Sequence, residues 1–361
     1  MWPYVVLILL PILAQHMRVK GATLYIARPE EDNSRKALRL FFGMLLLLLI
    51  LRHQSVGIDM KNYIRIFEYI TKSSWSKALG RSAEIGYSAL NKLVSLVTED
   101  FFWMQAAAAV LSVWCLGNAY SRYSGDGALT IVLFVVLSNF VLVFSGLRQS
   151  IAISLGFWAF EQVRRRRFLP FLAVVVLAVL FHTSAFMLIF LYPLYHVRIS
   201  RKWLLWVIPA MAVVFLFNRQ IFGVLTVFLS MYTKYDAHIS STGAYTMLIL
   251  FSLFAVFAYL IPDEEALDAD TLGMRNYLLL AVVLQMFAPL HNLAMRMNYY
   301  YMAFIPLVIP RIIRCRSTRW NQVALAARHI MVVFFAVYFF ATAPEDNVLR
   351  TFPYRFFWEK P

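Results

Sequence analysis

The stretch IVLFVVLSNFVLVFSGLRQSIAISLGFWAF, residues 131–160, is thirty residues long and contains one charged side chain, Arg148. As a single helix it would extend for about 45 Å, well beyond the roughly 30 Å hydrocarbon core of a bilayer. The chain therefore has to turn within this stretch. Ser145 and Gly146 mark the natural position, because glycine relieves the backbone constraint at a tight turn. Arg148 is then expected at the tip of a helical hairpin.

The next long apolar run, FLPFLAVVVLAVLFHTSAFMLIFLYPLYHV at residues 168–197, repeats this design. It is also too long for one span, and the only polar interruption is His182 with Thr183 and Ser184. We therefore predict that His182 caps a second hairpin.

The composition of the whole chain indicates a membrane protein. Of its 361 residues, 61% are hydrophobic and 15% are charged, whereas soluble domains are about half apolar and a quarter charged. Apolar runs predict an all-α polytopic integral membrane protein, a single transmembrane domain over residues 1–361, with about twelve transmembrane helices and a range of ten to fourteen. The expected spans lie near residues 2–16, 37–51, 101–118, 128–145, 147–163, 168–181, 184–197, 203–217, 244–262, 276–291, 297–313 and 329–343.

The distribution of lysine and arginine predicts the orientation of these spans, because short basic loops resist translocation. With the first residue outside, the basic segments 18–39, 164–167, 198–202 and 311–328 all lie in the cytoplasm. The net charge of +15 is then mostly anchoring against anionic membrane lipid, and it does not indicate a nucleic-acid partner. The hairpin tips at Arg148 and His182 both point to the opposite, outer face.

The outer loop at residues 52–100 contains two amphipathic patterns at helical spacing, which predict interfacial helices lying on the membrane. Tyr63 belongs to the first pattern and Tyr87 to the second. Each pattern has an acidic residue near its expected helix start, Asp59 before the first and Glu84 before the second. Carboxylates are also favoured at helix N-termini for structural reasons alone, so both readings stay open.

Three basic residues expected on the outer face have structural alternatives as well. Arg148 could extend to the lipid headgroups, although an arginine facing a bundle interior is usually functional. His182 could be part of a capping turn, but histidine as a residue type can exchange a proton near neutral pH, and this one is expected in the same layer as Arg148. Arg296, which precedes a tyrosine cluster, could be an interfacial anchor.

The segments GIDMKNYIRIF, EIGYSALNKL, SGLRQSIAISL and LFHTSAF, in this order, resemble the EpsG-type branch of the Wzy polysaccharide polymerases. The similarity is greatest over residues 57–190, and the segment MRMNYYYMAFIPLVI at 295–309 is similar to the family's later arginine and tyrosine region. The resemblance implies a glycosyltransferase of GT-C-like architecture in the bacterial inner membrane, without a cofactor or a required metal. Such an enzyme joins polyprenyl-diphosphate-linked oligosaccharide repeat units into O-antigen, capsule or exopolysaccharide at the outer face. A chain-length regulator and a flippase would be its partners, beside membrane lipid.

The resemblance also assigns site residues. The family's acidic elements fall on Asp59, Glu84 and Tyr87, its L-R-Q motif on Arg148 and Gln149, its H-x-S motif on His182 and Ser184, and its later arginine on Arg296. A guanidinium can hold phosphate oxygens bidentately, so Arg148 and Arg296 are expected to stabilise the departing diphosphate. We expect His182 to be the general base, with Asp59 and Glu84 as rival candidates. Tyr63 and Tyr87 could stack on sugar rings or sit in the membrane interface.

Three other functions are compatible with parts of this pattern. An exporter of polysaccharide or lipid-linked sugar predicts internal repeats and helices broken at the membrane midplane. The sequence has no evident half-to-half repeat, and its unusual charges gather at one face rather than at mid-depth, which argues against export. A membrane acyltransferase that modifies surface sugars predicts a cluster reachable from the cytoplasm. A membrane scaffold predicts that Arg148 and His182 can be replaced without effect.

Overall fold

The computed structural model describes residues 1–16, 29–80, 84–137, 139–228, 241–315, 321–343, 347 and 349–359. Within these ranges the regular elements are helices, and one isolated β-bridge joins Arg52 to Phe356. The prediction of an all-α fold is confirmed.

The chain divides into two compact units, one formed by residues 1–188 and 327–361 and the other by residues 189–326. The single transmembrane domain predicted for residues 1–361 stays a prediction, because compactness does not define how a chain sits in a bilayer. The helices of the first unit are α1 (Trp2–His16), α2 (Pro29–Leu51), α3 (Met60–Thr71), α4 (Trp75–Gly80), α5 (Ile85–Ser95), α6 (Phe101–Tyr123), α7 (Gly127–Val136), α8 (Asn139–Ser145), α9 (Leu147–Arg164), α10 (Phe168–Phe181), most of the 3-10 helix η1 (Thr183–Phe190) and most of α18 (Asn321–Thr342).

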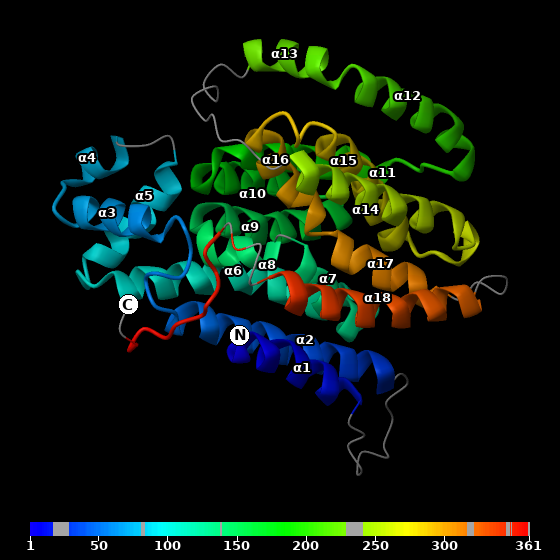
Figure 1. Ribbon diagram of the computed structural model, residues 1–361. Coiled ribbons are helices and arrows are strands. Elements are labelled where there is room, and N and C mark those ends of the chain that lie inside the picture. The colour runs from blue at the N-terminus through cyan, green and yellow to red at the C-terminus, as the bar shows by residue number, and fades with distance from the viewer. Residues whose placement is uncertain are drawn as a thin grey trace. The chain divides into compact units, whose positions relative to one another are not determined.

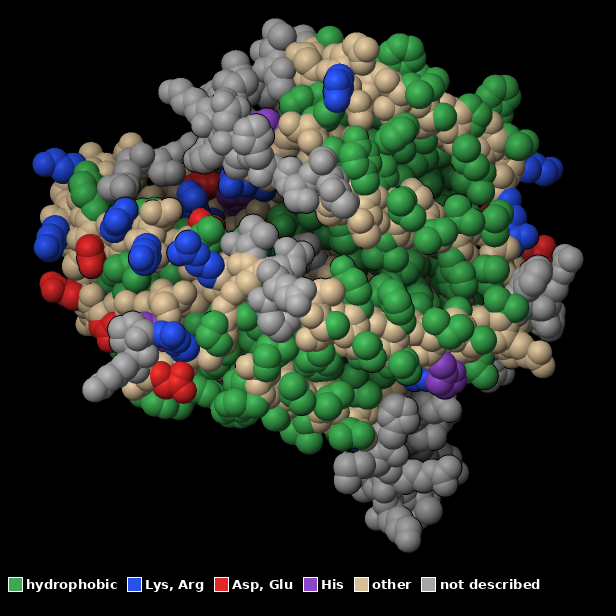
Figure 2. Space-filling model, viewed as in Figure 1, with side chains coloured by type: hydrophobic (Ala, Val, Ile, Leu, Met, Phe, Trp, Pro, Cys, Tyr) green, Lys and Arg blue, Asp and Glu red, His purple; other side chains and the backbone are tan. Residues whose placement is uncertain are grey.

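The long helices of the first unit pack side by side, and the three short helices of the outer loop lie at one end of them (Figure 1). Helix α9 packs against both α6 and α10, and α2 packs against both α1 and α6. Helix α3 contacts α6, while α5 contacts α6 and α10. Charged side chains gather over α3, α4 and α5, whereas hydrophobic side chains cover much of the longer helices (Figure 2).

Both breaks expected in the long apolar runs are present. Helix α8 ends at Ser145 and α9 begins at Leu147, with Gly146 between them. Helix α10 ends at Phe181, and His182 follows it as an extended C-cap residue. Arg164 is the last residue of α9, and the arginines at 165–167 form the turn between α9 and α10.

Some predicted spans have different bounds in the structure. The span expected at 128–145 is divided into α7 and α8, which are bent by 60° relative to each other. The helix expected at 276–291 is α15 (Ala269–Gln285), which starts earlier because the Asp268 side chain accepts a hydrogen bond from Thr271 N and caps it. Buried Arg275 lies inside this helix, so a charge that looked like a boundary is part of it.

Length and apolar composition qualify three of the described helices as membrane spans, namely α6, residues 243–260 of α14 (Ser241–Leu260), and α18. Two bent pairs, α7 with α8 and residues 201–216 with 218–224, raise this number to five if each pair is one span. The chain is therefore a helical membrane protein, while the number of twelve spans and the GT-C-like architecture stay predictions.

The second unit is held together by buried polar side chains on its helices. Its elements are α11 (Leu191–His196), the 3-10 helix η2 (Arg201–Trp203), α12 (Leu204–Leu216), α13 (Asn218–Phe228), α14, the 3-10 helix η4 (Glu264–Ala266), α15, α16 (Asn292–Met302) and α17 (Ile305–Arg314). The guanidinium of Arg275 donates to the Ile199 carbonyl at 2.8 Å and to Glu264 at 3.1 Å. Asp268 binds Arg311. The acidic stretch at 262–270 thus ties α15 to its neighbours.

Gly57, in the loop before α3, permits a close contact that no other residue could make. Its φ of +109° is in the left-handed region, and a Cβ atom there would overlap the Phe144 carbonyl oxygen. We expect Gly57→Ala to destabilise the protein by about 2 kcal/mol or more, from backbone strain and steric overlap. The thermal unfolding midpoint in lipid nanodiscs measures this effect. Gly43→Ala is the control, since nothing lies within 4 Å of a Cβ on that helical residue, and an equal loss in both variants would contradict the prediction.

Candidate functional site

Glu84 lies at the centre of a cluster of charged and aromatic side chains in the first unit. It occupies the N-cap position of α5 but makes no side-chain cap. Instead, its Oε2 binds Arg148 Nη1 in an ion pair, and its Oε1 lies 2.6 Å from His182 Nδ1. The backbone N–H of Thr183 also donates to Oε1, at 3.4 Å. A single carboxylate therefore links the two residues that cap the predicted hairpins.

Each member of this cluster sits at a helix end. Glu84 precedes α5, Arg148 is in the first turn of α9, and His182 follows the last residue of α10. Because α9 and α10 are joined by a short turn and pack on each other, the start of one helix lies beside the end of the other. The turn at Gly146 and the break at His182 thus place both side chains next to the outer-loop helices.

Two tyrosines line the guanidinium of Arg148. The rings of Tyr63 on α3 and Tyr87 on α5 are 5.5 Å apart between centroids. The Arg148 Cζ atom is 5.6 Å from the Tyr63 centroid and 6.0 Å from the Tyr87 centroid, within the range of cation–π attraction. Lys92 of α5 fixes the two helices, since its Nζ lies 3.4 Å from the carbonyl oxygens of Ile70 and Thr71 at the end of α3.

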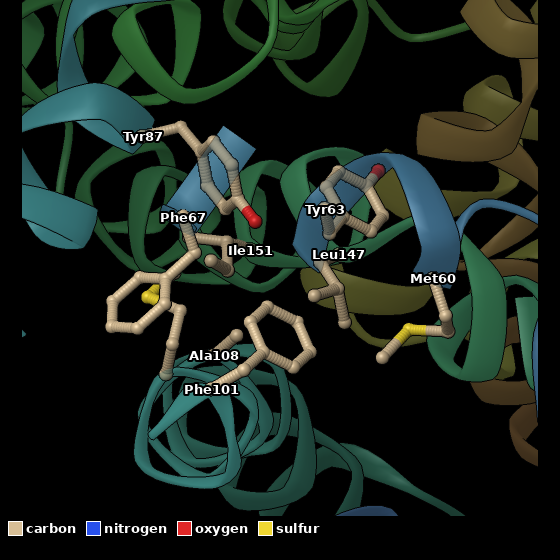
Figure 3. Close-up of a cluster of buried hydrophobic side chains, with 9 residues drawn as sticks. Met60, Tyr63, Phe67, Tyr87, Phe101, Ala108, Leu147 and Ile151 are labelled. Atoms are coloured by element: carbon tan, nitrogen blue, oxygen red, sulfur yellow. The ribbon is translucent and has the colours of Figure 1, made fainter. Parts of the chain in front are cut away.

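The two tyrosines belong to an apolar cluster that anchors the outer-loop helices on α6 and α9 (Figure 3). Its buried members are Met60, Tyr63, Phe67, Tyr87, Phe101, Met104, Ala108, Leu147 and Ile151. The amphipathic patterns predicted for the loop do form helices, and the apolar face of α3 is covered by the chain itself. The placement of these helices on the membrane surface stays a prediction.

The surroundings keep Glu84 ionised and the tyrosines neutral. Burial alone would raise the pKa of the Glu84 carboxyl, but the hydrogen bond and charge of His182, with the charge of Arg148, outweigh burial and hold that pKa below its ordinary value. Burial raises the pKa of the phenols of Tyr63 and Tyr87. Because ionised Glu84 can only accept, His182 Nδ1–H is the donor whether the ring is charged or neutral. In the neutral form of the ring the lone pair is on Nε2.

Three buried polar atoms of this cluster have no hydrogen-bond partner among the described residues. They are His182 Nε2, Arg148 Nε and Tyr87 Oη. Buried polar groups in folded proteins nearly always have partners, so orphan atoms gathered at one place indicate hydrogen-bonding capacity for a ligand or water. The cluster can therefore accept one proton, at Nε2, and donate further hydrogen bonds from Arg148 and Tyr87.

The other predicted site residues lie in different environments. Asp59 is half-buried at the N-cap of α3, where its backbone N–H donates to Ser145 Oγ at 3.4 Å. Gln149 and Ser184 are buried next to Arg148 and Thr183 in the sequence. Arg296 belongs to the second unit, where it lies exposed on α16, and its role in substrate binding stays a prediction. Over the described residues, no group of three or more His, Cys, Asp and Glu side chains is arranged to hold a metal ion.

Sequence reasoning did not single out Arg52, which is almost fully buried between α2 and the outer loop. An arginine directly after an apolar run is typical of a membrane-interface anchor. The printed sequence contains no signal that separates this buried arginine from such an anchor.

Replacing Glu84 with glutamine should lower stability at neutral pH by about 2 kcal/mol, through loss of hydrogen bonds between charged groups. Because the pKa of Glu84 is lowered in the folded protein, its contribution is present above the ordinary value of 4.5 and is lost as the pH falls through the lower folded value. Unfolding midpoints of wild type and Glu84→Gln should differ at neutral pH and converge as the pH falls below the ordinary value of 4.5 and through the lower folded pKa. A difference that stays constant across this range would contradict the prediction.

Comparison with known protein families tests the family resemblance of the four sequence motifs. The EpsG family matches residues 36–356, which include every residue of the cluster. The chain belongs to the EpsG family. This confirms the predicted resemblance and indicates a membrane protein of the polysaccharide-polymerase type. Comparisons with curated proteins and with solved structures gave no significant match.

Proposed function

We propose that this EpsG-family protein joins polyprenyl-diphosphate-linked oligosaccharide repeat units into a surface polysaccharide at the outer face of the bacterial inner membrane. The observation that carries the proposal is Glu84, which binds Arg148 through one oxygen and His182 through the other. A glycosyl transfer of this kind needs a base for the incoming hydroxyl and a cation for the leaving diphosphate. Of the two residues that Glu84 binds, His182 can supply the base and Arg148 the cation.

His182 is the proposed general base. Glu84 accepts from Nδ1–H, which fixes the tautomer and leaves the lone pair of Nε2 for the acceptor sugar hydroxyl. As the hydroxyl oxygen attacks the anomeric carbon of the donor, its proton moves to Nε2 and the bond from that carbon to the phosphate oxygen breaks. Glu84 then stabilises the imidazolium that forms. Since both of its oxygens are already bound, Glu84 suits this orienting role better than that of the base.

Arg148 is the proposed cation for the leaving group. When the bond between the anomeric carbon and the phosphate oxygen breaks, its electron pair moves to the diphosphate. The diphosphate therefore gains negative charge in the transition state. A guanidinium can meet this charge with several fixed donors, and Arg148 has an Nε that is not used by Glu84. Its position in the first turn of α9, at the end of an apolar helix, fits a substrate that carries an apolar tail behind its diphosphate.

Further parts of the proposal follow from the predicted topology. With about twelve spans in a GT-C-like arrangement, the cluster faces the outer side, where lipid-linked repeat units arrive after a flippase. Tyr63 and Tyr87 offer aromatic surface for sugar rings, and a chain-length regulator would act on the growing polymer. The proposed glycosyl transfer requires neither a cofactor nor a metal.

The direct test is reconstitution of the purified protein in lipid with the lipid-linked repeat unit of its host and no cytosolic fraction. We expect a ladder of polymer on a carbohydrate gel, with release of one polyprenyl diphosphate for each bond formed. A protein carrying both Arg148→Ala and His182→Ala should give no ladder. Failure of well-folded wild type on verified substrate would contradict the proposal.

A further inference from the structure

Arg52 is a buried cation that forms no ion pair with any residue that the structure describes. It is 1% exposed and lies one residue beyond the end of α2. Its Nη1 donates to the carbonyl oxygen of Phe144, and its Nη2 lies 3.5 Å from Met60 Sδ. Its Nε has no hydrogen-bond partner within the described ranges. In the part of the chain that the structure describes, no carboxylate forms an ion pair with Arg52. Burying an unpaired charge is costly, so a role that requires the guanidinium is expected.

The carbonyl that Arg52 binds lies directly before the turn that leads to Arg148. Phe144 is the penultimate residue of α8, and Ser145 and Gly146 follow it. The segment 52–59 makes two more contacts with this turn, because Gly57 packs against the Phe144 carbonyl and Asp59 N–H donates to Ser145 Oγ. Both residues before Gly146 are therefore held by one segment of the outer loop.

The segment 349–357, which we call the strap, holds the loop from its other side. Four backbone hydrogen bonds join them, from His53 N to Arg355 O, from Phe357 N to Leu51 O, from Gly57 N to Arg350 O and from Ile58 N to Leu349 O, at 2.8–2.9 Å. The strap is tied to the first two helices, since Tyr4 Oη donates to Thr351 O at 2.7 Å and Tyr354 Oη donates to Leu48 O at 2.8 Å. The loop that carries Arg52 is thus clamped between the strap and the turn.

We infer that Arg52 is a positioning residue for Arg148. By binding the Phe144 carbonyl, it sets the turn between α8 and α9, so that the first turn of α9 presents Arg148 to Glu84. Arginine suits this task because its planar guanidinium can hold the carbonyl through Nη1 while Nη2 contacts Met60 Sδ. The functional readout of this inference rests on the proposed function, whereas its structural readout does not.

A double-mutant cycle tests whether Arg52 acts through Arg148. Arg52→Met should lower the affinity for a polyprenyl diphosphate in nanodiscs and the rate of chain extension by up to about 100-fold, the cost of a misplaced catalytic group. In an Arg148→Ala background the same change should cost almost nothing more, because the two residues act as one unit. Arg52→Lys, which keeps the charge and a donor nitrogen but not the planar fork, should recover part of the loss.

Arg275→Met is the matched control, because Arg275 is equally buried and also donates to a backbone carbonyl, but in the second unit. Its effect should be the same with and without Arg148. Additive losses for Arg52→Met and Arg148→Ala would overturn the inference, since they would show that Arg52 acts independently.

Hydrogen exchange of the peptide at residues 140–150 provides a readout without substrate. Arg52→Met should accelerate exchange of this peptide at least about tenfold, through loosening of the turn, while Arg275→Met should not. Unchanged exchange in Arg52→Met would overturn the inference even if activity falls. Faster exchange in a protein whose wild type makes no polymer would support the positioning role and contradict the proposed function.

Discussion

His182→Ala should lower the rate of chain extension by about 10² to 10⁴-fold, the usual contribution of general acid–base catalysis. His182 Nε2 is buried and has no partner among the residues that the structure describes, and Nδ1 is held by Glu84. Removal of the ring therefore eliminates the proton acceptor while leaving Arg148 and Glu84 paired. The measurement is the initial rate of polyprenyl diphosphate release at saturating repeat unit. The affinity for the donor should change little, since the diphosphate is assigned to Arg148.

Two controls separate a base from a structural histidine. His329→Ala removes an exposed histidine of α18 and should leave the rate unchanged. Imidazole added to His182→Ala should restore part of the rate with a dependence on pH, because the free base replaces the missing acceptor. A His182→Ala protein that extends chains at the wild-type rate would refute the assignment of His182 as the base.

Arg148→Ala should reduce the rate of extension by about 10³-fold, the order expected for loss of a donor aimed at developing negative charge. It should also weaken binding of the diphosphate donor, because the same guanidinium meets the ground-state phosphates. Arg148→Lys should lose less, since it retains the charge but not the planar fork. Rates and donor affinities in nanodiscs measure both effects.

Arg122→Ala is the matched control for Arg148→Ala. Arg122 is near the end of α6, is 65% exposed and lies 3.9 Å from a glutamate, Glu161. It thus resembles Arg148 in charge and pairing but lies outside the cluster. If both variants lose activity equally, or if neither does, Arg148 has no special role in the leaving-group step and serves as a membrane anchor.

Several features of the site could be predicted from the sequence because they depend on local chain length and chain chemistry. A thirty-residue run with one charge must turn, and glycine is the residue at which it turns, so the start of α9 at Leu147 was predictable. The same argument identified the break at His182. The order of the four motifs correctly indicated the EpsG family.

The bridging role of Glu84 could not be predicted in this way. An acid before a helix is usually a cap, and the sequence contains no sign that Glu84 leaves α5 uncapped. Its partners are 64 and 98 residues away along the chain. Contacts at such separations depend on how α5, α9 and α10 pack, and many packings are compatible with one hydropathy pattern.

The amino-acid sequence by itself thus determined the helical membrane class, the breaks at Gly146 and His182, and the family. The class and the breaks follow from hydrophobic length and from local backbone preferences, which act between near neighbours, and the family follows from the order of the four motifs. Only the tertiary structure decided that Glu84 joins Arg148 to His182 and that Arg52 holds the turn at Phe144. The physical reason is that hydrogen bonds and ion pairs form between atoms close in space, and the packing of distant helices selects which charges meet.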